Sequence, residues 1–323
     1  MNGPQHGIRA AAAISGEGPR ALILIVEDDD IQAGILTAVL ERAGFGVDAT
    51  ASGLNALPKM RKTIYDVVLI DYQLADIDGI ATVRLIRDFM GPAARPVLIA
   101  VTVTPEVLNA RTNDNESLFD LVAGKSGGLS PVLAFIRHRL SLAADVAARR
   151  EAASALLEQA RLEYFSGPRR PEAAGDNPVP ARILIVEDDE SQRLLLESVV
   201  RARGYSVETA SNGLEAVHKI RNERFDLALV DYIIPEIDGL AVAKLTHHLM
   251  ADTIRPRLIA LTMRPEALHD AEGYADIMFD KIIEKSSGFD ELMRIVDSLM
   301  KLSPNLATRR AAEFSTRTVN SGR

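Results

Sequence analysis

The chain has no cysteine and no tryptophan, and aromatic residues make up only 5% of its 323 residues. The lack of cysteine excludes disulfides, thiolate metal sites and a cysteine nucleophile. No apolar run approaches the ~20 residues that a membrane-spanning helix needs, so no association with a membrane is expected. Residues 1–20 lack the basic and apolar stretches of a secretory signal. We therefore expect a flexible leader and a cytoplasmic protein.

Basic residues are outnumbered by acidic ones, and the formal net charge is −8. An acidic surface repels the phosphate backbone of nucleic acids, so no direct nucleic-acid partner is expected for the molecule as a whole. The excess of carboxylates suits a cation-binding site better.

The second half of the chain repeats the first at an offset of 160 residues. The stretch ALILIVEDD at residues 21–29 returns as ARILIVEDD at residues 181–189, and Lys125 returns as Lys285 without a gap. A period this long indicates a duplicated domain, and the chain length suits two domains of roughly 100–200 residues. We expect domains over residues 21–140 and 182–302, a linker over 141–181 that is helical and then rich in proline and glycine, and a flexible tail over 303–323.

Short apolar runs alternate with helical patterns in each copy. In the first copy the runs are Leu22–Val26, Phe45–Thr50, Val67–Ile70, Val97–Val101 and Leu118–Ala123. This alternation predicts βαβ units and a parallel sheet covered on both faces. We therefore predict an α/β fold with two flavodoxin-like, doubly wound (βα)5 domains, whose ligands lie beyond the carboxyl ends of the strands. A helix from about Pro131 to Phe165 is expected to join them as a plain linker rather than a coiled coil.

Acidic residues stand where two of these strands end. The two sets are Glu27, Asp28 and Asp71 in the first copy and Glu187, Asp188 and Asp231 in the second. Because neighbouring strand ends converge in a doubly wound sheet, each set should share one pocket. Three close carboxylates repel one another, which raises the pKa of at least one of them unless a cation neutralises the cluster. Oxygen ligands of this kind predict Mg²⁺, with Mn²⁺ as the alternative.

A lysine and a threonine are predicted at the same edge of each sheet. They are Lys125 and Thr102 in the first copy and Lys285 and Thr262 in the second. Together with a divalent ion and carboxylates around one further aspartate, these groups fit covalent catalysis through an aspartyl phosphate. The metal and the lysine would neutralise the oxygens of the transferring phosphoryl group, where such reactions gain most of their stabilisation.

In this order and at this spacing, the motifs resemble the receiver domains of two-component response regulators, and they do so twice. The motifs are Val26-Glu27-Asp28-Asp29, Leu69-Ile70-Asp71-Tyr72, Asp78-Gly79, Val101-Thr102 and Lys125, followed by Val186-Glu187-Asp188-Asp189, Leu229-Val230-Asp231-Tyr232, Pro235, Asp238-Gly239, Leu261-Thr262 and Lys285. The resemblance implies that Asp71 and Asp231 accept phosphoryl groups from a histidine kinase or a histidine phosphotransfer protein. It implies that the metal is held by Glu27, Asp28, Asp71 and the carbonyl of Gln73, and by Glu187, Asp188, Asp231 and the carbonyl of Ile233. It also implies phosphate contacts for Thr102, Lys125, Thr262 and Lys285.

The chain departs from the family pattern at three places. Both lysines precede serine where the family usually has proline. The aromatic residue that the family places three residues before the lysine is Val122 in one copy and Ile282 in the other, so activation is not expected to use the usual aromatic rotation. The first copy also has Ala75 where the second has Pro235.

The resemblance implies a phosphorelay protein that switches protein–protein interactions, and not an enzyme beyond its own phosphorylation and dephosphorylation. No signature of a separate output domain is present, so an unidentified downstream protein or a homodimer is the expected partner. Ile233 cannot orient an attacking water, and a longer-lived phosphate is therefore expected on Asp231 than on Asp71. Two alternatives stay open, an unphosphorylated pseudo-receiver scaffold and an aspartate-nucleophile phosphatase. Phosphatases of that kind usually have a second aspartate where Gln73 and Ile233 stand.

Overall fold

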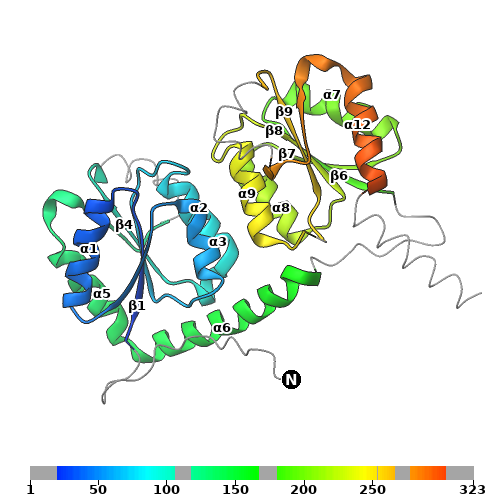
Figure 1. Ribbon diagram of the computed structural model, residues 1–323. Helices are drawn as coiled ribbons and strands as arrows, with labels where there is room; N and C mark the ends of the chain where they lie inside the picture. The colour runs from blue at the N-terminus through cyan, green and yellow to red at the C-terminus, as the bar shows by residue number, and fades with distance from the viewer. Residues whose placement is uncertain (1–19, 106–117, 167–179, 253, 266–276, 303–323) are drawn as a thin grey trace, which may run out of the picture. The chain divides into compact units, whose positions relative to one another are not determined.

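The computed structural model describes residues 20–105, 118–166, 180–252, 254–265 and 277–302 (Figure 1). The expected leader up to residue 19, the proline- and glycine-rich stretch 167–179 and the expected tail 303–323 lie outside the described residues. The chain divides into two compact units, Met1–Ala160 and Arg161–Arg323, and each is treated by itself below. Among the described helices, none is long and apolar enough to cross a membrane.

The first unit contains a five-stranded parallel sheet in the order β2-β1-β3-β4-β5. Its strands are β1 (Leu22–Val26), β2 (Gly46–Thr50), β3 (Val67–Ile70), β4 (Val97–Thr102) and β5 (Leu121–Gly124). Its helices are α1 (Asp30–Arg42), α2 (Gly53–Met60), α3 (Gly79–Ala94), α5 (Ser130–Ser141) and α6 (Ala143–Ser166), with a 3₁₀ turn η1 (Lys125–Gly127).

The second unit repeats this architecture, with the sheet order β10-β9-β8-β6-β7. Its strands are β6 (Arg182–Val186), β7 (Ser206–Ala210), β8 (Leu227–Asp231), β9 (Arg257–Thr262) and β10 (Lys281–Glu284). Its helices are α7 (Glu190–Ala202), α8 (Gly213–Asn222), α9 (Gly239–Leu249) and α12 (Phe289–Leu302), with a 3₁₀ turn η2 (Lys285–Ser287).

Helices cover both faces of each sheet. In the first unit α1 and α5 lie on one face, and α2 and α3 lie on the other (Figure 1). The face toward α1 and α5 is closed by a cluster in which Ile25 and Leu69 of the strands pack with Leu36 of α1 and Ile136 of α5. Strands that are buried on both faces explain the continuous apolar runs in the sequence. The strand order is that of the flavodoxin-like doubly wound fold, so the fold prediction is confirmed.

Strand bounds in the first unit follow the predicted runs closely, except in β5, which begins at Leu121 and not at Leu118. The amide of Asp120 donates to Leu98 O at 2.7 Å, and Oδ2 of the same residue accepts the amide of Leu98 at 2.8 Å. Asp120 therefore hydrogen-bonds both backbone groups of Leu98, near the start of β4, before β5 begins. Phe119 is buried in the core without belonging to a strand, which is why its apolar side chain misled the prediction.

The helix expected after β5 is divided in two. Leu142, with ψ 70°, lies between α5 and α6, and its carbonyl accepts the amides of Asp145 and Val146 at the start of α6. From there α6 packs on its own unit, where Ala153 is buried and Arg150 pairs with Asp66 at 2.7 Å. The expectation of one continuous helix is therefore wrong, because these contacts turn α6 toward the sheet that precedes it.

Candidate functional site

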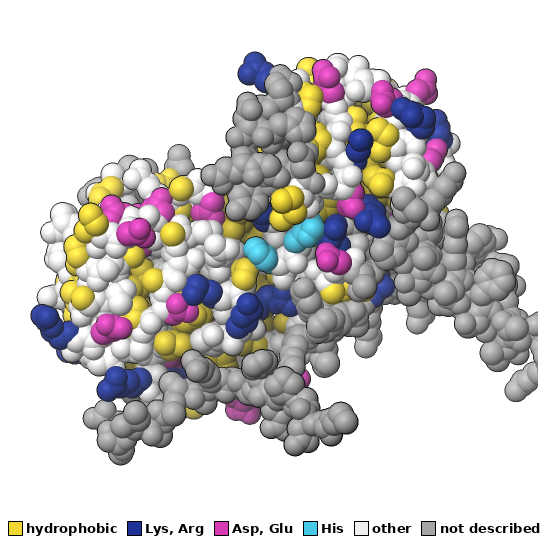
Figure 2. Space-filling model, in the orientation of Figure 1, with side chains coloured by type: hydrophobic (Ala, Val, Ile, Leu, Met, Phe, Trp, Pro, Cys, Tyr) yellow, Lys and Arg dark blue, Asp and Glu magenta, His cyan; other side chains and the backbone are white. Residues whose placement is uncertain are grey.

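The three acidic residues of each copy come together at the carboxyl edge of the sheet. Glu27, Asp28 and Asp71 each offer an oxygen within 4.8 Å of the others. Glu27 and Asp71 are only 3% and 8% exposed, whereas Asp28 is exposed. Glu187, Asp188 and Asp231 form a second cluster with the same pattern of burial. In Figure 2, acidic side chains lie along the upper edge of the first unit, where its strands end.

The pairing of β1 with β3 creates the first cluster. Val26 lies opposite Ile70 in the parallel register, so the next residue of each strand, Glu27 or Asp71, leaves the sheet beside the other. The amide of Asp71 donates to Val26 O at 2.9 Å and holds this register at the strand end. Asp29 then starts α1, because its carboxylate accepts two amides of the first turn. Strand register and a helix cap thus place the cluster.

A glycine is required behind each phosphoacceptor candidate. The amide of Gly79 donates to Tyr72 O at 2.9 Å. A Cβ on Gly79 would lie 2.6 Å from Asp71 O and 2.9 Å from Tyr72 Cα. Because both neighbours are backbone atoms, a side chain could enter only by displacing the loop that carries Asp71. Gly239 approaches Asp231 O in the same way, at 2.6 Å.

Lys125 joins the two buried carboxylates of the first cluster. Its Nζ donates to Asp71 Oδ2 at 2.7 Å and to Glu27 Oε2 at 2.8 Å. Lys125 reaches them because it follows β5 directly, at the same edge of the sheet. In the second unit, Lys285 donates to Asp231 at 2.7 Å and to Glu187 at 2.8 Å. The structure thus brings both predicted lysines into the clusters.

Burial determines the electrostatics of each cluster. It is the main cause that raises the pKa of Glu27; the hydrogen bond from Lys125 opposes the rise, and the charge of Asp71 adds to it. For Lys125, burial by itself would lower the pKa, but the hydrogen bonds to Asp71 and Glu27 outweigh burial and raise it. The pKa values of Glu187 and Lys285 shift in the same directions for the corresponding reasons. One lysine faces three carboxylates, so each cluster has room for further positive charge.

The two clusters fit a hard divalent cation. Among the described residues, Oε1 of Glu27 and Oε1 of Glu187 are buried oxygens without a hydrogen-bond partner. A buried carboxylate oxygen without a partner is costly, and ligation of a cation would remove that cost. Carboxylate oxygens are the ligands that Mg²⁺ prefers. The residues present therefore fit Mg²⁺.

The predicted threonines end β4 and β9. Thr102 and Thr262 are buried, and each hydroxyl oxygen accepts the backbone amide of the residue two positions later. The distances are 3.2 Å to the amide of Thr104 and 3.1 Å to that of Arg264. These bonds tie each threonine to the loop that leaves the carboxyl edge of the sheet.

Gln73 and Ile233, whose carbonyls the resemblance implicates, follow Asp71 and Asp231 in the loops after β3 and β8. Each amide donates a long hydrogen bond, 3.4 Å, to Oδ1 of the aspartate two residues before it. Ile233 is 77% exposed and Gln73 is also exposed. Each loop lies beside the acidic cluster of its own domain, and the two loops thus present different side chains to solvent, an amide in one and an apolar side chain in the other.

Comparison with known proteins agrees with this geometry. The family model described as the response regulator receiver domain matches residues 23–117 and 183–297, more than half of the chain. The chain belongs to the response regulator receiver family. The prediction of two tandem receiver domains is confirmed, and receiver domains act in two-component signalling.

Individual relatives match part of the chain. Response regulator MprA of Mycobacterium sp. (strain KMS) is 32% identical over 123 residues, which are 38% of this chain and 52% of MprA. The alkaline phosphatase synthesis transcriptional regulatory protein PhoP of Bacillus subtilis (strain 168) is 33% identical over 112 residues, 35% of this chain and 41% of PhoP. The match thus spans about half the length of these relatives.

Solved receiver structures match in the same way. Response regulator protein TrrA of Thermotoga maritima, in complex with Mg(2+)-BeF, is 33% identical with a TM-score of 0.34, and the match covers 37% of this chain and 98% of TrrA. The complex of TrrA with histidine kinase ThkA gives 34% identity and a TM-score of 0.33, covering 37% of this chain and 97% of the matched chain.

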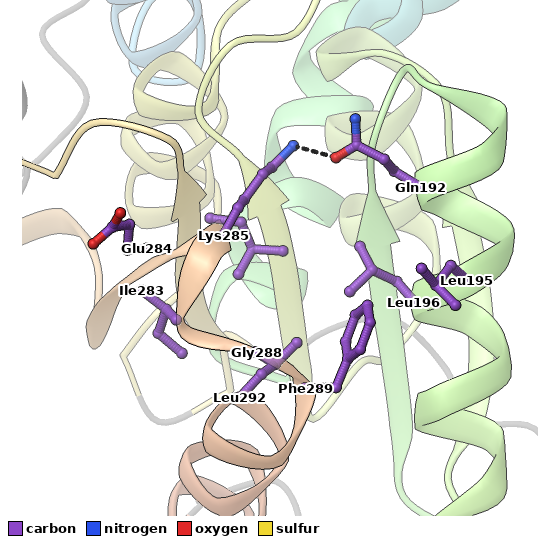
Figure 3. A pocket seen from close by; sticks show the side chains of 10 residues that line it. Gln192, Leu195, Leu196, Ile283, Glu284, Lys285, Gly288, Phe289 and Leu292 are labelled. Atoms are coloured by element: carbon purple, nitrogen blue, oxygen red, sulfur yellow. Dashed lines mark hydrogen bonds between the residues drawn. The ribbon is translucent and has the colours of Figure 1, made fainter.

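Gln192 is a neighbour of the second receiver site that sequence reasoning missed. Its Oε1 accepts a hydrogen bond from Lys285 Nζ at 3.1 Å (Figure 3). The first receiver domain has Gln32 at the corresponding place, but the Nε2 of Gln32 donates to Asp29 Oδ2 at 3.4 Å. Because both copies carry glutamine, no signal in the sequence separates these two roles.

Arg193 is a second missed neighbour. Its Nη1 donates to the backbone carbonyl of Glu187 at 2.9 Å and to that of Asp188 at 3.2 Å. The first receiver domain has Ala33 there. The guanidinium of Arg193 is therefore hydrogen-bonded to the loop that carries Glu187 and Asp188, and alanine at the corresponding position of the first domain cannot make such bonds.

A cavity of about 170 Å³ adjoins the second site. Its apolar walls include Leu195 and Leu196 of α7 and Phe289 and Leu292 of α12, and Figure 3 shows Lys285 at one end of it. The cavity thus begins at Gln192 and Lys285, beside the acidic cluster, and extends between α7 and α12.

Proposed function

We propose that both receiver domains, over residues 21–140 and 182–302, are working phosphoacceptors in a phosphorelay. Asp71 and Asp231 accept phosphoryl groups from a histidine kinase or a histidine phosphotransfer protein. The observation that carries this proposal is the double occurrence of one arrangement, a buried aspartate that shares a lysine with a buried glutamate, at the same distances. The similarity to response regulators supports it.

Each cluster would hold Mg²⁺, or Mn²⁺ as the alternative. The proposed ligands are Glu27, Asp28, Asp71 and the Gln73 carbonyl in one domain, and Glu187, Asp188, Asp231 and the Ile233 carbonyl in the other. The unpartnered glutamate oxygens support this assignment. When bound, the ion supplies positive charge that neutralises phosphoryl oxygens.

Phosphoryl transfer would begin with attack of an Asp71 carboxylate oxygen on the phosphorus of a phosphohistidine. The new P–O bond forms as the P–N bond breaks, and the imidazole nitrogen keeps the electron pair and takes up a proton from solvent. Lys125, whose Nζ already lies 2.7 Å from Asp71 Oδ2, would then donate a hydrogen bond to one phosphoryl oxygen, and the hydroxyl of Thr102 would donate a hydrogen bond to another. In the second domain the same parts are Asp231, Lys285 and Thr262.

The output would be a change of binding surface. Phosphorylation adds about −1.5 to −2 charges at one point, which shifts the domain between two conformations. Val122 on β5 and Ile282 on β10 offer no aromatic ring, so the loops after Thr102 and Thr262 would carry the switch. An unidentified downstream protein or a second copy of the chain would read that surface, and the chain would have no enzymatic activity beyond its own phosphorylation and dephosphorylation.

Intact mass spectrometry tests this function directly. After incubation with a small-molecule phosphodonor and Mg²⁺, the wild type should carry two phosphoryl groups, Asp71→Asn and Asp231→Asn one each, and the double variant none. Asp29→Asn, which alters a helix cap beside the first cluster, is the matched control and should keep both. Absence of any adduct on the wild type, with Mg²⁺ binding shown by calorimetry, would refute the proposal and favour a pseudo-receiver scaffold.

The two phosphates should differ in lifetime. Gln73 can orient a water molecule toward the phosphorus on Asp71, whereas the exposed apolar side chain of Ile233 cannot do so beside Asp231. Loss of each phosphate should be followed after removal of the donor, with the exchanged pair Gln73→Ile and Ile233→Gln as the matched test. We expect slower loss from Asp231 in the wild type and a reversed order in the exchanged protein. Faster loss from Asp231 in the wild type would contradict this reasoning.

A further inference from the structure

A carboxylate at the amino edge of the first sheet is approached by two arginines that stop short of it. Asp120 stands just before β5 and is partly buried. Nη2 of Arg95 lies 3.8 Å from Asp120 Oδ1, and Nη2 of Arg139 lies 3.9 Å from the same oxygen. Both distances exceed the length of a hydrogen bond. The two guanidiniums therefore converge on one oxygen without forming a hydrogen-bonded pair with it.

Arg149 of α6 is a third arginine at this edge. Its charge interacts with the charges of Arg139 and Asp120. Its Nε donates to Asp145 O at 3.4 Å, which is a backbone oxygen and not a carboxylate. We call Arg95, Arg139 and Arg149 the amino-edge arginines.

Negative charge does not balance the amino-edge arginines. The carboxylates whose charges reach them are Asp66, Asp120 and Asp145. Asp66 is already paired with Arg150 through two hydrogen bonds, at 2.8 Å and 2.7 Å. Asp145 is exposed, so water and salt screen its charge. Among the described residues, Asp120 is therefore the carboxylate that is left to face three guanidiniums.

Two observations show the consequence of this imbalance. Burial is the main cause that lowers the pKa of Arg95; the charge of Asp120 opposes the shift, and the charge of Arg139 adds to it. The pKa of Arg149 is also lowered, again mainly by burial and with the charge of Arg139 adding to the shift. In addition, Nε of Arg139 is buried without a hydrogen-bond partner among the described residues. A buried donor without a partner is costly, and a bound anion would remove that cost.

The second domain balances the corresponding charges. Asp280 is the counterpart of Asp120 at the offset of 160 residues. It accepts hydrogen bonds from Arg257 at 2.6 Å and from Arg255 at 3.4 Å, and Arg255 also donates to Asp252 at 3.0 Å. Two arginines thus share two carboxylates within hydrogen-bond distance. The surplus of positive charge at the amino edge therefore distinguishes the first domain from the second.

We propose that the amino-edge arginines bind a phosphate-type anion, either inorganic phosphate or the phosphate group of a phosphorylated small molecule. Guanidinium groups match the geometry of phosphate oxygens and donate to them in pairs. The anion would lie between Arg95 and Arg139, whose Nη2 atoms already converge, and it would give Nε of Arg139 an acceptor. The site lies at the opposite edge of the sheet from Asp71, and the inference is independent of phosphorylation.

Titration calorimetry of the full chain with sodium phosphate tests this site. Mg²⁺ is left out, so that the acidic clusters repel anions and no phosphoryl transfer takes place. The wild type should bind phosphate with a dissociation constant on the order of 1 mM or lower. A parallel titration with phenyl phosphate separates the two sources, because tighter binding of the ester would assign the site to phosphorylated small molecules. Absence of saturable binding of both compounds up to about 10 mM would overturn the proposal.

Three variants separate the site from a general charge effect. Arg139→Leu introduces the residue that the second domain has at this position, Leu299, and should weaken binding about tenfold or more. Arg137→Gln, which removes an exposed arginine of the same helix, is the matched control and should bind as the wild type does. Asp120→Asn should tighten binding, because it removes negative charge while its amide oxygen can still accept the amide of Leu98. Equal weakening by Arg139→Leu and Arg137→Gln would overturn the proposal.

Heteronuclear NMR of the wild type tests the site without any substitution. The Nε–H resonance of Arg139 should shift and then saturate as phosphate is added, because Nε gains an acceptor. The Nε–H resonance of Arg137 should stay unchanged over the same range. An Arg139 resonance that does not move while calorimetry shows saturable binding would place the anion elsewhere and would also overturn the proposal.

Discussion

Replacement of Lys125 by methionine should destabilise the metal-free first receiver domain. The Nζ of Lys125 donates to two buried carboxylates, and the side chain is only 15% exposed. Removal of one partner from a buried ion pair costs about 3–5 kcal/mol. The cluster opens to solvent through Asp28, which lowers the expected cost to about 2–3 kcal/mol. Urea unfolding with and without Mg²⁺ measures this cost.

The same replacement should strengthen Mg²⁺ binding, because the lysine and the ion compete for the same oxygens. At ~5 Å, the scale of the carboxylate cluster, a unit charge and a divalent ion repel by about 1.7 kcal/mol even in water. About 1.4 kcal/mol corresponds to a factor of ten in affinity. Removal of the lysine charge should therefore tighten binding about tenfold or more, and the added Mg²⁺ should restore much of the lost stability.

Titration calorimetry is the suitable assay, since the chain has no tryptophan to report on the site by fluorescence. Lys285→Met provides an independent repeat in the second domain. Lys62→Met, at an exposed turn, is the control and should change neither quantity. Weaker Mg²⁺ binding by a folded Lys125→Met protein would refute the competition argument and would show that the lysine organises the carboxylates for the metal.

Mg²⁺ affinity should fall as the pH is lowered from neutral to about pH 5, because burial raises the pKa of Glu27 and protons compete with the ion. The raised pKa of Glu27 also stabilises the metal-free domain at low pH, and that stability is lost as the pH rises through the pKa of the folded state. Calorimetry at several pH values measures the Mg²⁺ affinity, and urea unfolding at the same pH values measures the stability. An Mg²⁺ affinity that does not change with pH would contradict the first expectation. Gly79→Ala should cost about 1–3 kcal/mol in urea unfolding, because the new Cβ meets backbone. Gly34→Ala, with nothing within 4 Å of its Cβ, is the helical control and should be neutral or stabilising. Gln192→Ala should slow phosphorylation of the second domain about fivefold, because it removes roughly one hydrogen bond to Lys285. Gln32→Ala should leave the phosphorylation rate of the first domain unchanged, and equal effects of the two variants on the rate of adduct formation would contradict a role for Gln192.

The fold and the acidic clusters could be predicted because both follow from local patterns and strand order. Apolar runs mark buried parallel strands, and the residue after a run lies at the carboxyl edge whatever the rest of the chain does. For Glu27 and Asp71 this was sufficient, since the register of β1 with β3 places them side by side. The repeat supplied a second instance of every such position and made a chance pattern less plausible.

The course of α6 could not be predicted in the same way. Leu142 ends α5 without a glycine or a proline to mark it. The contact that seats α6 joins Arg150 to Asp66 across 84 residues, and helical periodicity says nothing about a single polar pair over that span. Asp120 shows the same limit on a smaller scale, because its carboxylate closes β4 from a segment that appeared from its composition to belong to β5.

The two receiver sites are equal in their motif residues and unequal in what surrounds them. The second lysine has Gln192 as a further hydrogen-bond acceptor, and Arg193 braces the carbonyls of the loop that carries two proposed metal ligands. Such bracing reduces the conformational freedom that the loop loses when it binds an ion. If the domains differ in Mg²⁺ affinity, the cause would then lie in loop order and not in ligand identity, and Arg193→Ala would bring the second domain toward the first, which has Ala33 there.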